Sequence, residues 1–198
     1  MFALLPPVTR ALILANAAVF LLQSFLPGLL IPFALWPLGP YFAPWQVVTY
    51  AFLHGSLVHL FFNMLALFMF GRELEDYWGS RRFIVYYMAS VLAAAAAQLA
   101  VTAATHSIYP TVGASGGVFG LLLAFAIHFP HQRITLLFPP IPMPAWLFVT
   151  LYGALELVLG VTGTQAGVAH FAHLGGMAGG ALVILYWRSR RPRRRGPW

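Results

Sequence analysis

Three groups of polar residues lie within otherwise apolar stretches of the sequence. Polar side chains in such stretches are costly, and by default they are candidates for function. His59 and Asn63 are four residues apart, so a helix places them on one face. Ser115 lies in the segment GASGGVFG, and His173 lies in the segment AHFAHLGGMAGG. A serine hydroxyl beside an imidazole is a base-activated nucleophile, and Asn and His side chains can donate hydrogen bonds to an oxyanion.

Glycines surround Ser115 and follow His173 at a spacing that lets helices approach closely within a membrane. They are Gly113, Gly116, Gly117 and Gly120 around the serine, and Gly175, Gly176, Gly179 and Gly180 after the histidine. Packing of these two smooth faces against each other would bring the hydroxyl and the imidazole within hydrogen-bond reach. Ser115 also falls in the first turn of a predicted helix, where unpaired N–H groups and the helix dipole favour negative charge.

The composition indicates which kind of protein must position these residues. Hydrophobic residues make up 61% of the 198 and charged residues only 8%, too few charges to cover the apolar surface of a soluble globule. A disordered chain, a nucleic-acid-binding domain and an ordinary soluble enzyme are therefore excluded. The composition predicts an all-α polytopic membrane protein. Because the chain has no cysteine, it has neither a thiol nucleophile nor a disulfide.

Six apolar stretches are long enough, or nearly so, to be membrane spans, since ~20 helical residues cross a ~30 Å hydrocarbon core. They cover residues 9–27, 51–70, 83–101, 113–129, 145–161 and 167–187. We interpret the first as an uncleaved span rather than a signal peptide, because it contains Asn16 and Gln23 and no clean cleavage region follows it. Residues 1–187 are thus predicted to form a single six-span membrane domain, followed by an Arg-rich tail over 188–198.

The arginines predict the orientation of these spans. The chain has no lysine, and six of its eleven arginines lie in the tail. The other five precede the first span or lie between spans two and three or four and five, whereas the loops 28–50, 102–112 and 162–166 carry no charge. The positive-inside rule then places both termini in the cytoplasm. The tail is a topology signal or a contact to anionic lipid, so no nucleic-acid partner is expected.

With this topology, spans two, four and six all start on the extracytoplasmic side of a cell membrane. His59 is then expected ~12 Å below residue 51, and Ser115 and His173 also fall in the outer half of the membrane. We therefore predict a water-accessible cavity that opens away from the cytoplasm.

Taken together, the motifs resemble those of the rhomboid intramembrane serine proteases, in the family's order, from about Trp45 to Gly180. The HxxxN motif is His59 and Asn63, and the GxSG motif spans residues 113–116. The HxxGxxxG motif comprises His173, Gly176 and Gly180, and the GxxxExxxG motif comprises Gly71, Glu75 and Gly79. The chain is similar to the minimal six-helix form of the family.

The resemblance implies an endopeptidase that cleaves transmembrane or juxtamembrane segments of single-span membrane proteins, without a cofactor or a metal. Ser115 would be the nucleophile and His173 the general base of a Ser–His dyad. His59, Asn63 and the Ser115 backbone N–H would form the oxyanion hole, with Gly113 shaping the loop. Phe119 stands where the family has an aromatic residue under the base, here without the hydroxyl of Tyr.

The acidic residues are not expected to take part in the dyad. Glu73, Glu75 and Asp76 are predicted on the cytoplasmic side, so His173 should be oriented by packing alone. Glu75 is expected to be structural, bound to a helix end or an arginine. Glu156 lies mid-span near the family's proposed lateral gate for substrate, and we interpret it as a gate or stability residue.

Some polar residues receive no assigned role from the sequence. They are His54, His170 and Gln46, which follows Trp45 where the family often has arginine. His170 and His173 could bind a metal with His59, but we expect no carboxylate or cysteine nearby to complete such a site. The sequence does not indicate an oligomeric state.

Two other functions are compatible with parts of the pattern. A catalytically inactive rhomboid-like protein would bind membrane clients, but it would have no chemical need for both Ser115 and His173. A small-solute or metal transporter could use the buried histidines, but the sequence has no visible internal repeat and no carboxylate ligand set.

Overall fold

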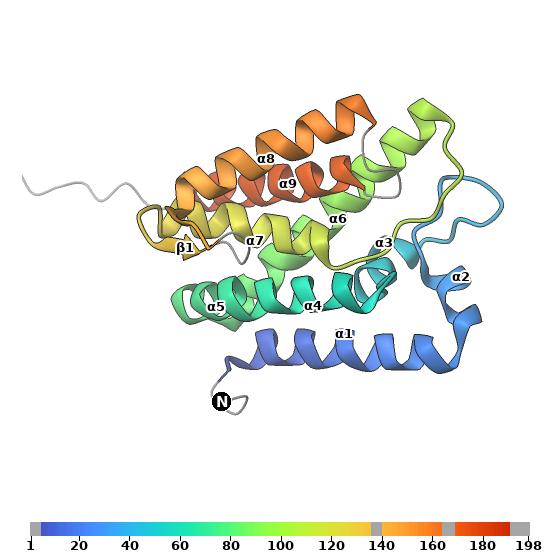
Figure 1. Ribbon diagram of the computed structural model, residues 1–198, viewed down its shortest axis with the longest axis horizontal. Coiled ribbons are helices and arrows are strands. Elements are labelled where there is room, and N and C mark those ends of the chain that lie inside the picture. The colour runs from blue at the N-terminus through green and yellow to red at the C-terminus, as the bar shows by residue number, and fades with distance from the viewer. Residues whose placement is uncertain (1–4, 136–139, 164–168, 191–198) are drawn as a thin grey trace, which may run out of the picture.

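The computed structural model describes residues 5–135, 140–163 and 169–190 of the chain. This part is a bundle of helices with two short antiparallel strands at one end (Figure 1). The strands are β1 (Arg133–Thr135) and β2 (Pro142–Pro144). The predicted helical class is therefore confirmed.

The helices coincide closely with the apolar stretches of the sequence. The long ones are α1 (Pro7–Phe25), α6 (Ser80–Thr105), α7 (Ser115–His128), α8 (Ala145–Thr162) and α9 (His170–Ser189). A further continuous helix runs through α4 (Leu57–Ala66), the π-helical turn η4 (Leu67–Gly71) and α5 (Arg72–Trp78). Within the described residues, four helices are long and apolar enough to cross a membrane: Pro7–Phe25, Leu57–Trp78, Ser80–Thr105 and Ala145–Thr162. Helix α7 is apolar but shorter, with 14 residues, and α9 has 20. The count of six spans and the cytoplasmic termini stay predictions.

The second span begins later than the sequence predicts. We expected a helix from residue 51, but α4 begins at Leu57, because Ser56 caps it by accepting a hydrogen bond from the His59 backbone N–H at 3.1 Å. The expectation that His59 lies ~12 Å below the start of its span is therefore wrong. His59 lies in the first turn of α4. The preceding residues form the short helices α3 (Gln46–Thr49) and η3 (Tyr50–Phe52).

The first loop is built around Gln46, which is buried. Its side-chain oxygen accepts from the Trp36 N–H at 3.2 Å, and its amide nitrogen donates to the Tyr41 carbonyl at 2.9 Å. The loop contains η2 (Pro27–Leu29) and α2 (Leu30–Phe33). Leu35 and Thr111 exchange two backbone hydrogen bonds of 2.9 Å, which tie this loop to the segment before Ser115. Glutamine thus makes the loop contacts at the position where the family often has arginine.

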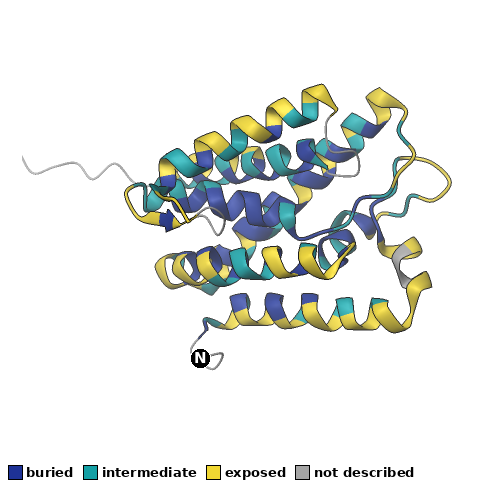
Figure 2. Ribbon diagram, viewed as in Figure 1, coloured by how far each residue is buried: buried dark blue, intermediate teal, exposed yellow. Residues whose placement is uncertain are grey.

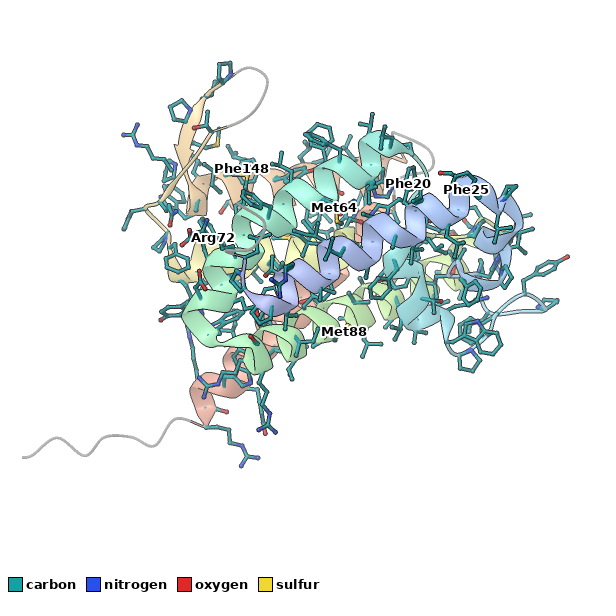
Figure 3. All side chains as sticks on the ribbon, turned by 90° about the horizontal axis from the view of Figure 1, so that it is seen from below. Phe20, Phe25, Met64, Arg72, Met88 and Phe148 are labelled. Carbon is teal, nitrogen blue, oxygen red and sulfur yellow. The ribbon has the colours of Figure 1, made fainter. Side chains whose placement is uncertain are left out.

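Helix α7 occupies the centre of the bundle, and α1 and α8 lie at its outside. Figure 2 shows α7 almost wholly buried, whereas α1 and α8 each present an exposed face. Most exposed side chains of α8 are apolar, as expected for a helix that contacts lipid; they include Leu151, Leu155, Val158 and Val161. Phe20 and Phe25 project from the second half of α1, at the opposite end of the bundle from Arg72 (Figure 3).

Candidate active site

Ser115 and His173 lie in contact, as the glycine pattern indicates. Ser115 is the first residue of α7, and His173 lies in the first turn of α9. The Ser115 Oγ atom is 2.8 Å from His173 Nε2. Both side chains line one cavity, so the hydroxyl and its base are accessible to a substrate. This geometry can generate a serine nucleophile by proton transfer to the imidazole.

Glycines bring the two helices together at this point. A Cβ atom on Gly176 of α9 would overlap the backbone carbonyl of Gly116 on α7, so neither helix could keep its position with a larger residue there. On the next face of α9, Gly175 and Gly179 lie against Ala97 and Ala93 of α6. The small residues therefore fix the distance from α9 to both neighbours.

The His173 ring is stacked on Phe119. The ring centroids are 4.2 Å apart, and the planes are inclined by only 6°. Phe119 lies one turn after Ser115 on α7, and it also contacts Tyr152 of α8, with centroids 4.9 Å apart. Packing thus fixes the plane of the imidazole, as expected.

Glu156 also holds His173, which the sequence did not indicate. Its Oε2 atom is 2.8 Å from Nδ1 of His173 and 2.7 Å from Nδ1 of His170. The expectation that His173 is oriented by packing alone is therefore wrong. The three residues come from α8 and α9, and no motif spacing connects Glu156 with the histidines. The available signal was charge: a carboxylate in the middle of an apolar helix requires hydrogen-bond donors.

The same cluster corrects the expectation about metal ligands. A carboxylate does lie beside His170 and His173, and the three ligand atoms are within 4.8 Å of one another. The cluster contains Glu156 in place of His59. Its N···O distances of 2.7 and 2.8 Å are those of hydrogen bonds. Two ligands of one tetrahedral zinc would lie about 3.3 Å apart, given metal–ligand bonds of about 2.0–2.1 Å.

His59 and Asn63 of α4 line the same cavity as Ser115. The Asn63 amide nitrogen donates to the His59 carbonyl at 2.9 Å, one turn earlier on α4. The His59 ring packs edge-on against His54, with centroids 5.0 Å apart. It also lies against Gly113, where a Cβ atom would come within 2.6 Å of the ring. Two side chains that can donate hydrogen bonds, and the start of α7 with its N–H groups, thus line one cavity with Ser115.

The cavity itself has a volume of about 1000 Å³ and lies between α4, α7 and α8. Its walls are mainly apolar and include Phe62, Phe70, Val118, Phe148 and Leu155. Its polar lining residues include His59, Asn63 and His173 as well as Ser115. A cavity of this size and polarity can hold a short peptide segment with apolar side chains.

Residues 41–190 match the Rhomboid domain family. The chain belongs to this family. It is 33% identical to Rhomboid protein 1, mitochondrial, of Saccharomyces cerevisiae, over 77% of this chain and 46% of that protein. It is 28% identical to the human presenilin-associated rhomboid-like protein, mitochondrial, over 71% of this chain and 38% of that protein. The Rhomboid protease GluP of Bacillus subtilis is 38% identical over 39% of this chain and 14% of the protease.

The rhomboid chain described here spans less than half the length of these relatives, because the matches cover 46%, 38% and 14% of them. The match to the Rhomboid domain, over residues 41–190, contains every motif residue of the proposed site. Membrane location follows from the family together with the four apolar helices.

Glu75, in the fourth rhomboid motif, binds a helix end, one of the two structural contacts expected for it. Its carboxylate accepts from the Val8 and Thr9 backbone N–H groups at 2.9 and 2.7 Å, at the start of α1. It also accepts from the Thr9 hydroxyl at 2.7 Å and from the Ser80 hydroxyl at 2.6 Å. Glu75 therefore joins α1 to the turn between α5 and α6, far from Ser115.

Proposed function

We propose that this rhomboid is an intramembrane serine endopeptidase that cleaves transmembrane or juxtamembrane segments of single-span membrane proteins. The observation that carries the proposal is the 2.8 Å contact between Ser115 Oγ and His173 Nε2 at the wall of an apolar cavity. The Bacillus subtilis relative is named a protease, which agrees with it.

In the first half of the reaction, Ser115 Oγ attacks the scissile carbonyl carbon while its proton passes to His173 Nε2. The carbonyl oxygen becomes an oxyanion, which His59, Asn63 and the Ser115 backbone N–H can stabilise with hydrogen bonds. Collapse of this intermediate breaks the C–N bond, and His173 returns the proton to the leaving nitrogen. The product is an acyl-enzyme on Ser115.

In the second half, water attacks the acyl carbonyl while His173 takes the water proton. Collapse of this second intermediate breaks the ester bond between the carbonyl carbon and Ser115 Oγ, which releases the carboxyl product, and His173 returns the proton to Ser115 Oγ. A transmembrane substrate has its amides hydrogen-bonded within its own helix, so it must unwind locally before either step. Helix-breaking residues near the scissile bond should therefore favour cleavage, as the family resemblance also implies. A small residue before the bond would suit a narrow cavity, a preference that the family resemblance also implies.

We further propose that the protein resides in the cell membrane and that the cavity opens on the extracytoplasmic side. The charge-free loops that precede Ser115 and His173 support this orientation. Two of the relatives are mitochondrial by name, so fractionation of the tagged protein in its own cell tests a mitochondrial membrane against the cell membrane.

Cleavage of a single-span substrate by the purified protein in liposomes tests the proposed reaction. We expect wild type to cut, and Ser115→Ala and His173→Ala to lose at least about 10³-fold in rate, because either change removes the activated nucleophile. A fluorophosphonate probe should label wild type and not Ser115→Ala. Ser24→Ala and His131→Ala are matched controls, because both residues are exposed and lie outside the cavity lining.

Each outcome separates the proposal from its rivals. Cleavage that persists in Ser115→Ala contradicts the serine mechanism. If wild type neither cuts nor reacts with the probe but co-purifies with the substrate, the protein is an inactive client-binding rhomboid. If wild type reacts with the probe but does not cut, Ser115 is a reactive nucleophile and the substrate tested is the wrong one.

A further inference from the structure

We propose that Glu156 is a positioning residue for His173, so that the site operates as a Ser–His–Glu triad rather than a dyad. The inference rests on the proposed function and deepens it. It is carried by a continuous row of contacts: Ser115 Oγ to His173 Nε2 at 2.8 Å, and His173 Nδ1 to Glu156 Oε2 at 2.8 Å.

The two contacts involve opposite nitrogens of one ring, which determines where its proton lies. An ionised carboxylate only accepts hydrogen bonds, so the proton of neutral His173 must be on Nδ1. The lone pair is then on Nε2, where it accepts the Ser115 hydroxyl. Only this tautomer can take the serine proton.

Packing against Phe119 does not determine which edge of the His173 ring faces Ser115. Phe119 fixes the plane of the His173 ring by stacking at an angle of 6°, but stacking is nearly unchanged if the ring turns over within that plane. A ring turned over about its Cβ–Cγ bond would present the carbon Cε1 to Ser115 in place of Nε2, and the carbon Cδ2 to Glu156 in place of Nδ1. The directional contact that distinguishes the two ring nitrogens is the carboxylate of Glu156.

His170 holds the carboxylate in place. Its Nδ1 atom is 2.7 Å from the same oxygen of Glu156, and both side chains are about 5% exposed. Two N–H donors on one oxygen compensate for burial of the carboxylate in the interface between α8 and α9. His170 and His173 are three residues apart on α9, so one helical turn presents both rings to the same oxygen.

Glu156 acts through His173 and not on the substrate. Among the described residues, the cavity lining contains His173 but not Glu156. During attack, the serine proton moves to Nε2 and His173 becomes a cation with a proton on each nitrogen. The carboxylate stays ionised and stabilises this cation, and the Nε2 proton then passes to the leaving nitrogen.

The test compares Glu156→Gln and Glu156→Asp with wild type in the liposome cleavage assay. We expect Glu156→Gln to lower kcat by about 10²- to 10⁴-fold, because a neutral amide neither stabilises the imidazolium nor enforces the tautomer. KM should change less than about threefold, since the cavity lining is intact. Glu156→Asp retains the charge but shortens the side chain, so its kcat should lie between the two. Glu73→Gln is the matched control, because Glu73 is exposed on α5.

Fluorophosphonate labelling separates a positioning role from a merely structural one. A positioning role predicts a slower labelling rate with the same final labelled fraction. A structural role predicts a smaller final labelled fraction, in which the labelled molecules react at the wild-type rate.

A wild-type kcat in folded Glu156→Gln overturns the inference. If Glu156→Gln does not fold, the kcat of Glu156→Asp decides in the same way, with a wild-type value overturning the inference. An inert wild-type protein would instead count against the proposed function itself.

Discussion

At the scale of single residues, the site depends on backbone conformation as much as on side chains. Gly113 precedes the nucleophile by two positions and has a φ of +130°, a conformation that residues with a Cβ atom rarely adopt. Its N–H donates to the Tyr50 carbonyl at 2.9 Å, and its Cα faces the His59 ring. The loop thus holds Ser115 and a candidate oxyanion donor in a fixed relation.

Gly113→Ala should therefore impair catalysis more than it impairs folding. The new Cβ would meet the His59 ring at 2.6 Å and displace it from the cavity wall. Loss of one oxyanion donor lowers kcat by roughly 10²-fold, which the cleavage assay measures directly. Gly163→Ala is the control, because Gly163 also has a positive φ, of 68°, but has no atom within 4 Å of the new Cβ. Equal losses of kcat in both variants would show that backbone strain, and not His59, is responsible.

The site residues that could be predicted from the sequence are those whose spacing from nearby residues forms a pattern. His59 and Asn63 share a helix face, and Ser115 and His173 each stand beside glycines that favour close packing. Glu156 has only apolar neighbours in the sequence, and its partners lie on another helix. Its contact with His173, at 2.8 Å between Oε2 and Nδ1, depends on the packing of α8 against α9, so no spacing in the sequence predicts it.

At the scale of helices, the site is assembled by the close contact of α7, α9 and α6. Glycines of α7 and α9 line these contacts, against alanines and tyrosines of α6. Tyr86 of α6 donates to the Gly120 carbonyl of α7 at 2.8 Å, and its hydroxyl occupies the space beside Gly180 of α9. A shift of α9 along α7 would therefore move His173 away from Ser115.

Gly176→Ala should destabilise the protein and reduce activity together. The added methyl group would overlap the Gly116 carbonyl on α7, and overpacking of this kind costs about 1–3 kcal/mol. Thermal unfolding in detergent should show a lower Tm than wild type. Gly153→Ala in α8 is the matched control, because its Cβ would meet only the flexible end of Met177 at 3.5 Å. Alanine favours a helix over glycine by about 0.5–1 kcal/mol, so this control should keep or raise the Tm. A Gly176→Ala variant as stable as Gly153→Ala would contradict the packing argument.

The apolar stretches predicted the positions of the helices well, because length and hydropathy determine a span. They did not predict where α4 begins, since residues 51–53 are as apolar as the helix that follows. The start is decided by Ser56, whose hydroxyl accepts the His59 N–H at 3.1 Å. Capping is a local hydrogen-bonding choice that hydropathy does not report.

At the scale of the whole molecule, the arginines of the described residues gather at one end of the bundle, and the site lies away from that end. The elements that carry arginines are the start of α1, α5, the start of α6, β1 and the end of α9, all at the left in Figure 1. Helix α7 begins away from these elements, toward the middle of the bundle in Figure 1, and Ser115 is its first residue. This arrangement was expected from the loop charges, and it gives the proposed orientation a physical basis.

The orientation can be tested with single cysteines, because the chain contains none. Ile108 is 85% exposed in the loop before α7, and His131 is exposed in the loop after it. In intact cells, a membrane-impermeant maleimide should label Ile108→Cys, whereas His131→Cys should react only after permeabilisation. The experiment tests α7 in particular, because this helix is short for a membrane span. Its 14 residues give about 21 Å of helix, less than the ~30 Å thickness of the hydrocarbon core. If both cysteines react from the same side, α7 does not cross the membrane and the six-span topology is wrong. If only His131→Cys reacts in intact cells, the bundle is inverted and the cavity opens to the cytoplasm.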